Sequence, residues 1–193
     1  SDVCSSDLAV AQAQHLGSGV APADLAGRTD FRAWSIVTID GEHARDFDDA
    51  ISLERLPNGH YWLGVHIADV SHYVQEGTPL DDEARLRGTS VYFPERAVHM
   101  FPSELSTGLC SLNPHVDRLV QSCLMEVDPR GAVVRYEIHD GVIHSRARMT
   151  YTDVNAIVAD RNPVLRERYA PLVPLFDLMH ELFGVLQIGR AHV

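Results

Sequence analysis

The chain has 193 residues, of which 45% are hydrophobic, and a formal net charge of −11. This composition suits one ordinary domain, or part of a larger one, with a buried core, and it excludes wholesale disorder. A transmembrane helix is also excluded, because it needs an apolar run of ~20 residues and the sequence has none. On charge alone the chain is not expected to bind nucleic acid, because a large phosphate footprint needs clustered basic residues.

The two ends share no pattern with their neighbours. Asp2–Leu8 can be encoded by GAC GTG TGC TCT TCC GAT CT, and the reverse complement of that DNA reads in frame as Ile188–Val193. We therefore expect residues 1–8 and 188–193 to derive from a sequencing adapter rather than from the native gene. The alternative is a disordered tail at each end. Residues 9–30 are expected to form a short helix and a connector from a preceding domain.

Strands are predicted in the middle of the chain and helices at its end. A β-branched run predicts a strand over 35–39 that ends at Asp40, and Asn58-Gly59 predicts a hairpin between strands 50–55 and 60–68. Further strands are predicted over 91–93, 119–127 and 133–149, and helices over 78–87, 151–159 and 171–186. The last helix is predicted to pack an apolar face against the sheet, formed by Leu172, Leu175, Phe176, Met179, Leu182, Phe183 and Leu186. The predicted fold class is mixed α/β (α+β).

Four aspartates, Asp40, Asp46, Asp48 and Asp49, fall within ten residues just after the strand that ends at Asp40. Two like charges about 4 Å apart repel by about 4 kcal/mol at an effective dielectric constant near 20, so such a cluster calls for a cation. Carboxylate oxygens at short spacing suit Mg²⁺ or Mn²⁺. Phe47 is expected to anchor the loop in the core. The alternative is a solvated acidic turn that caps a helix.

Five segments in this order resemble the RNB exoribonucleases, the ribonuclease II and ribonuclease R family. They are TIDGEHARDFDDA (38–50), HIADVSHYV (66–74), GTSVYFP (88–94), LSTGLCSLNPHVDR (105–118) and ARMTYTDV (147–154). The resemblance extends from about Gly27 to Ala159. GTSVYFP and GLCSLNP are more similar to the ribonuclease R branch than to ribonuclease II.

The resemblance implies that residues 31–187 are the N-terminal half of an RNB catalytic domain. The implied reaction is 3′-to-5′ hydrolysis of RNA that releases nucleoside 5′-monophosphates by a two-metal, Mg²⁺-dependent mechanism. The implied partner is the 3′ end of single-stranded RNA in the cytoplasm, without a membrane or an obligate protein partner. The family's later arginine motif and its flanking RNA-binding domains are expected outside this segment, so the fragment alone is expected to be inactive.

The resemblance also assigns roles to single residues. Asp40, Asp46, Asp48 and Asp49 match the family's metal-binding carboxylates, and Asp48 matches the one on which cleavage depends most. Tyr92 and Tyr151 match aromatic residues that contact RNA. Stacking of a base on an aromatic ring is worth about 1–3 kcal/mol and tolerates any sequence, as processive digestion requires.

Two other functions explain part of the sequence. A non-catalytic RNA-binding or regulatory module on the same fold would be favoured by loss of one of the aspartates, but all four are present. A metal-dependent phosphatase explains the carboxylates but not the two tyrosines.

Other candidate residues favour structural roles. The cysteines Cys4, Cys110 and Cys123 form no CxxC pair, and no HxxxH occurs, which argues against a zinc site or a disulfide framework and fits a reducing compartment. Cys110 and Trp62 are expected in the core, and Asp69 is expected in a turn.

Overall fold

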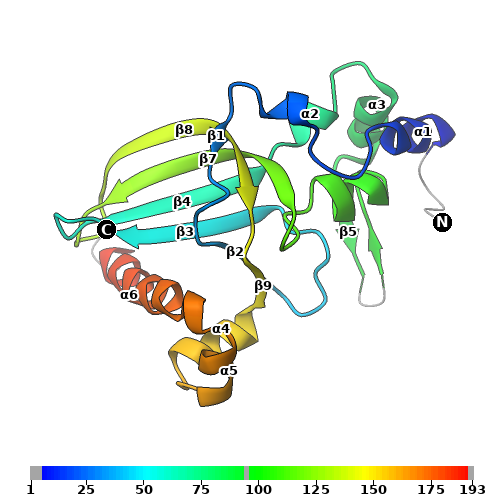
Figure 1. Cartoon of the computed structure of the whole chain (residues 1–193). Coiled ribbons are helices and arrows are strands. Elements are labelled where there is room, and N and C mark those ends of the chain that lie inside the picture. Colours follow the sequence, from blue (N-terminus) through cyan, green and yellow to red (C-terminus); the bar gives the residue numbers. More distant parts are fainter. Residues whose placement is uncertain (1–5, 94–95, 191–193) are drawn as a thin grey trace.

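The computed structural model describes residues 6–93 and 96–190. Its centre is a seven-stranded mixed sheet with the strand order β1-β8-β7-β4-β3-β2-β9 (Figure 1). The strands of this sheet are β1 (Thr29–Asp30), β2 (Ile36–Asp40), β3 (Asp49–Arg55), β4 (Tyr61–Ala68), β7 (Asp117–Val127), β8 (Val133–His144) and β9 (Ala147–Thr150). A separate hairpin pairs β5 (Val91–Tyr92) with β6 (Ala97–Val98). The predicted mixed α/β fold class is confirmed.

Helices lie at one end of the sheet and under one face of it (Figure 1). At the N-terminal side, α1 packs against α3, and in Figure 1 both lie beside the small β5–β6 hairpin. On the other side, α6 packs against β3 and α4. The helices are α1 (Asp7–His15), α2 (Val70–Tyr73), α3 (Pro79–Arg87), α4 (Tyr151–Val158), α5 (Pro163–Arg168) and α6 (Val173–Arg190), with shorter or irregular turns at Pro22–Leu25, Glu104–Leu109 and Ala170–Leu172.

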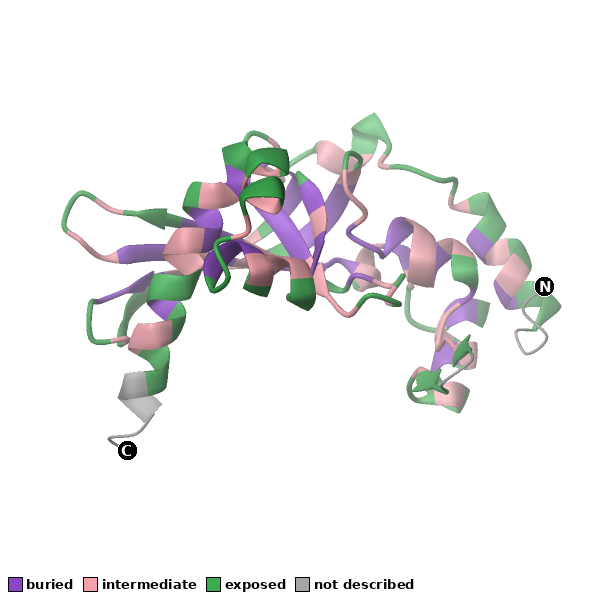
Figure 2. Ribbon diagram, turned by 90° about the horizontal axis from the view of Figure 1, so that it is seen from below, coloured by how far each residue is buried: buried purple, intermediate pink, exposed green. Residues whose placement is uncertain are grey.

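Two hydrophobic clusters occupy the two faces of the sheet, and Figure 2 shows the buried residues concentrated along its strands. Neighbouring residues of β2 point to opposite faces, so that Ile36 joins one cluster and Val37 the other. Both residues are fully buried. This explains why β2 is a continuous β-branched run rather than an alternating pattern. Among the described residues, no helix is long and apolar enough to cross a membrane.

The predicted single strand over 133–149 is wrong, because the chain leaves β8 at His144 and enters β9 at Ala147. The backbone groups of the two intervening residues bond elsewhere: Ser145 O accepts from His115 N at 2.9 Å, and Arg146 N donates to Ile36 O at 2.7 Å. β8 runs antiparallel to β7, whereas β9 runs parallel to β2 at the far end of the strand order. Since only two residues join strands that are so far apart in that order, the sheet must curl back toward itself.

The remaining predicted strands and helices are confirmed to within a few residues. The turn glycines Gly59 and Gly131 have φ values of 82° and 87°, a region that glycine enters without steric cost. The predicted last helix starts with a short turn and becomes α6 only at Val173. Phe183 and Leu186 were predicted to pack on the sheet, but they are 56% and 40% exposed, so that prediction is wrong for these two residues.

The short helix predicted at the start of residues 9–30 is present as α1. Ala9 and Ala13 of α1 are fully buried in the first cluster. α1 begins at Asp7 and α6 ends at Arg190, so described helices reach into the segments that we expect to be adapter-derived. Residues 1–5 and 191–193, which include Cys4 and His192, lie outside the described residues. The adapter origin and the domain boundaries stay predictions.

Candidate functional site

The four aspartates surround the connection between two neighbouring strands. Asp40 is the last residue of β2 and Asp49 is the first of β3, with Asp46 and Asp48 in the loop between them. β2 and β3 pair only from Ile36 to Val37, opposite Ser52 and Ile51, so the strands separate before they reach the aspartates. The loop therefore opens at one end of the sheet and presents its carboxylates there.

Phe47 anchors this loop, as predicted, and is 6% exposed. Its backbone N–H donates to Ser111 Oγ at 3.0 Å, and its carbonyl accepts from Leu112 N at 2.8 Å. Ser111 Oγ in turn donates to Arg45 O at 3.1 Å. The GLCSLNP segment thus fixes the backbone of the aspartate loop. Phe47 is buried between the half-buried Asp46 and the exposed Asp48, so its two neighbours point away from the core.

A second set of contacts joins the loop to β9, α4 and β4. Arg148 donates to the carbonyls of Gly41 and Glu42, the latter at 3.0 Å, and its guanidinium lies 5.5 Å from the centre of the Phe47 ring. Thr152 on α4 donates to the Glu42 carboxylate. On the other side, Ala68 N donates to Asp48 O at 2.9 Å.

The carboxylates raise one another's affinity for protons. Burial, followed by the charge of Asp49, raises the pKa of Asp40 to about 6. Burial and the charges of Asp46 and Asp49 also raise the pKa of Asp48. Oδ2 of Asp40 is buried and has no hydrogen-bond partner. A buried carboxylate oxygen without a donor is costly, and a cation would remove that cost.

The donor set fits a hard divalent cation, because it consists of carboxylate oxygens. Within residues 6–93 and 96–190, however, no three His, Cys, Asp or Glu side chains are already arranged as a complete set of metal ligands. The described carboxylates are therefore close enough to repel one another, but they would have to rotate to bind a shared ion.

Tyr92 lies beside the aspartates. Its hydroxyl donates to Asp46, and this hydrogen bond raises the pKa of Tyr92 to about 12. The ring is 63% exposed. Tyr92, Asp46 and Asp48 line a cavity of about 280 Å³ that also contacts Ala68 and Cys110.

Tyr151 is placed near the site by strand register. It follows β9, whose last residue, Thr150, pairs with Asp40. Tyr151 is the first residue of α4 and is 64% exposed. Both predicted aromatic residues are thus exposed, Tyr92 through a direct contact with Asp46 and Tyr151 at the same end of the sheet as Asp40.

His99 was missed by the sequence analysis. Its Nδ1 lies 3.6 Å from Asp46 Oδ2, and its ring centre lies 6.4 Å from that of Tyr92. His99 directly follows β6, and no sequence motif that we identified includes it.

Three structural assignments are confirmed. Cys110 is 5% exposed, and burial raises the pKa of its thiol to about 12, which keeps it protonated. Trp62 is 8% exposed and belongs to the core. Asp69 caps α2 by accepting from His72 N, and it also forms a buried ion pair with Arg28 at 2.6 Å.

Comparison with known proteins agrees with this arrangement. The model of the RNB domain matches residues 28–190. Ribonuclease R of Escherichia coli (strain K12) is 52% identical over 166 residues, which are 86% of this chain and 20% of that protein. The chain therefore spans about a fifth of the length of this relative.

Solved structures share the fold. The Mycoplasma genitalium RNase R in complex with ribose-methylated single-stranded RNA superposes with a TM-score of 0.86 at 29% identity, over 97% of this chain and 29% of that one. Yeast Ssd1, described as a pseudonuclease, shares the fold with a TM-score of 0.66 at 20% identity, over 74% of this chain and 18% of that one. Since the family model covers most of the sequence, the chain belongs to the RNB-domain family.

Proposed function

We propose that this chain is the aspartate-bearing part of a 3′-to-5′ exoribonuclease that releases nucleoside 5′-monophosphates from single-stranded RNA in the cytoplasm with Mg²⁺. The observation that carries the proposal is the group of four carboxylates at the open end of β2 and β3, with the unpartnered Oδ2 of Asp40 among them. The similarity to ribonuclease R proteins supports the choice of RNA as substrate.

The proposed division of work follows the resemblance to the RNB family, position by position. Asp40, Asp46 and Asp49 would hold Mg²⁺, with Mn²⁺ as a substitute, and Asp48 would join them as the carboxylate most needed for cleavage. When bound, the divalent cation supplies the positive charge that activates water and stabilises the phosphate during hydrolysis. The loop contacts made by Phe47 fix the backbone that carries the carboxylates, so that only the side chains have to turn to bind the ion.

The tyrosines would orient the RNA. Their exposed rings offer flat faces on which bases stack without regard to sequence. The Tyr92 hydroxyl, which donates to Asp46, would also orient that carboxylate. The net charge of this chain is −11, so we propose that other parts of a longer protein supply much of the phosphate-binding surface.

A chimera tests this proposal. Residues 28–190 replace the matching segment of the Escherichia coli ribonuclease R, and the purified chimera is given RNA labelled at either end. We expect labelled mononucleotide at once from the 3′-labelled RNA, only late label from the 5′-labelled RNA, and neither in EDTA. Internal cleavage products, or release from the 5′ end, would contradict the proposal.

The competing function is a non-catalytic RNA-binding module. The pseudonuclease Ssd1 shows that this fold also occurs in a protein so described. A chimera that binds RNA but releases no nucleotide at any Mg²⁺ concentration would favour this alternative.

A further inference from the structure

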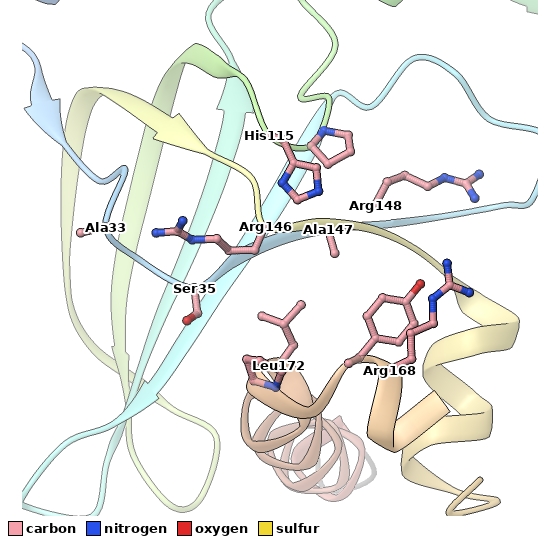
Figure 3. Close-up of a pocket in the computed structure, with 11 residues that line it drawn as sticks. Ala33, Ser35, His115, Arg146, Ala147, Arg148, Arg168 and Leu172 are labelled. Atoms are coloured by element: carbon pink, nitrogen blue, oxygen red, sulfur yellow. The ribbon is translucent and has the colours of Figure 1, made fainter. Parts of the chain in front are cut away.

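A cavity outside the aspartate site lies beside the edge strand β9. It has a volume of about 670 Å³ and is bounded by β9, the segment before β7 and the junction of α5 with α6. Figure 3 shows its residues, which include Arg146, Arg148, Arg168 and His115. This cavity is not part of the proposed catalytic machinery, although Arg148 reaches from it toward the aspartate loop.

The lining is strongly positive in an acidic protein. Three arginines line the cavity, and none of the described residues lining it is Asp or Glu. Most other described arginines are in ion pairs with carboxylates. Arg146, Arg148 and Arg168 form no ion pair with a described carboxylate, as is also true of Arg45 and Arg118 elsewhere in the fold. The charge of Arg148 partly offsets the rise in the pKa of Asp40, whereas the charges of Arg146 and Arg168 remain available to a ligand.

Backbone carbonyls hold two of these guanidinium groups without neutralising them. Arg146 donates to Arg32 O at 2.8 Å and to Trp34 O at 3.2 Å. Arg148 donates to the carbonyls of Gly41 and Glu42. A guanidinium has five N–H donors, so both keep donors for an anion. Orientation by fixed carbonyls also lowers the entropy lost when an anion binds.

The cavity extends along the strand toward the aspartates. In Figure 3, the Arg146 guanidinium extends to one side of Ala147, and those of Arg148 and Arg168 extend to the other. Arg148 pairs with Thr38 of β2 and contacts Gly41, the neighbour of Asp40. The arginines thus form a strip that ends beside the carboxylate loop. This arrangement suits the successive phosphates of one RNA strand.

The rest of the wall suits a nucleotide. The guanidinium of Arg168 lies 5.2 Å from the centre of the Tyr169 ring, which offers a combined aromatic and cationic surface. Leu172 adds an apolar wall. His115, which also lines the cavity, has a φ of 64°, which is uncommon for a residue other than glycine. Its backbone N–H donates to Ser145 O at 2.9 Å, and this hydrogen bond fixes its position.

We propose that this arginine-lined cavity binds the phosphate groups of single-stranded RNA outside the aspartate site. The choice of RNA rests on the proposed function, and the choice of phosphate rests on the arginines alone. Guanidinium groups match phosphate oxygens in shape and charge, and contacts to phosphate are independent of sequence. An acidic polypeptide segment is the competing occupant, and the test separates the two.

The experiment uses the chain itself in EDTA, where the aspartate site cannot hold a cation. Binding of a short fluorescein-labelled oligouridylate is followed by fluorescence anisotropy at several salt concentrations. The double variant Arg146→Gln, Arg168→Gln is compared with wild type, and Arg85→Gln on α3 is the matched control. Arg148 is left intact because it also holds the aspartate loop.

We expect the double variant to weaken RNA binding about tenfold or more. We also expect the slope of log affinity against log salt to fall by about 1.4, because each lost phosphate contact with a single strand contributes about 0.7. The control should match wild type, and inorganic phosphate should compete. The variant Arg146→Lys, Arg168→Lys keeps the charges and should retain most of the salt dependence, which separates loss of contact from loss of folding.

Equal RNA binding by wild type and the Gln variant, or no binding by wild type, would overturn the proposal. Competition by oligoglutamate as effective as that by RNA would overturn it in favour of a polypeptide occupant. This outcome can be distinguished from that of the catalytic proposal. If the chimera cleaves RNA but the chain fails the binding test, the proposed function stands and the cavity site is rejected. If the chimera is inactive but the chain passes the binding test, the cavity site stands and the proposed function is rejected.

Discussion

Asp40 offers the sharpest test of the cation site, because its substitution by Asn should stabilise the metal-free chain. Burial and the charge of Asp49 raise the pKa of Asp40 from its ordinary value of 3.8 to about 6. The native state therefore binds the proton more tightly than the unfolded state. The contribution of this proton to the free energy of unfolding is fully present below pH 3.8. It is lost as the pH rises to about 6 and is absent at neutral pH.

The size of this loss follows from the shift. Each pKa unit corresponds to about 1.36 kcal/mol, so the shift sets an upper limit of about 3 kcal/mol. Because Asp40 is only partly buried and solvent screens its charge, we expect Asp40→Asn to gain about 1–2 kcal/mol at pH 7 in EDTA. The gain should shrink toward zero as the pH falls below 4.

Urea denaturation measures this difference, with and without Mg²⁺. A ligand at a concentration of 100 times its Kd stabilises the native state by about 2.7 kcal/mol, so Mg²⁺ should stabilise wild type and act much less on Asp40→Asn. Asp82→Asn on exposed α3 is the control and should change neither value. A variant less stable than wild type in EDTA, or a Mg²⁺ response equal to that of wild type, would refute the reasoning.

Three further predictions concern other parts of the chain. His66 is buried between Ser52 and Ser122, and burial lowers its pKa from 6.5 to about 4. Neutral His66 therefore stabilises the fold above pH 6.5, and this stability is lost as the pH falls toward 4. The stability of His66→Gln, measured by urea denaturation across this range, should depend less on pH, and an unchanged pH profile would contradict the assignment. Ser111→Ala removes the acceptor for Phe47 N and should cost about 1–3 kcal/mol while weakening Mg²⁺ binding in calorimetry, whereas a stability loss with Mg²⁺ binding intact would separate the loop from the metal site. Tyr151→Ala in the chimera should weaken RNA binding by about 1–3 kcal/mol and Tyr151→Phe should restore it, so an equal loss in both would exclude stacking.

Much of the fold could be predicted because local signals agree with the final structure. The β-branched run before Asp40, the Asn58-Gly59 turn and the Thr150 cap each have a local physical cause. The break at Ser145–Arg146 could not be predicted, because it depends on partners distant in sequence, His115 and Ile36. Phe183 fits the helical period but is exposed, because the period alone does not say which part of a wide apolar face the sheet covers.

The candidate site divides in the same way. The aspartate spacing and the buried anchor Phe47 are visible in the sequence, because both arise within one short loop. His99 and Arg148 reach this loop only through the tertiary fold, from the β5–β6 hairpin and from β9. Net charge averages over the whole chain, so it gives no sign of the three arginines that line one cavity.

The central claim is that Asp48 belongs to the machinery that cleaves RNA. The most direct measurement is single-turnover release of mononucleotide from 3′-labelled RNA by the chimera, beside its Asp48→Asn and Asp82→Asn variants, with RNA binding measured on the same samples. The account predicts that Asp48→Asn abolishes release while binding remains, and that Asp82→Asn behaves as the parent. Retained turnover in Asp48→Asn would contradict it.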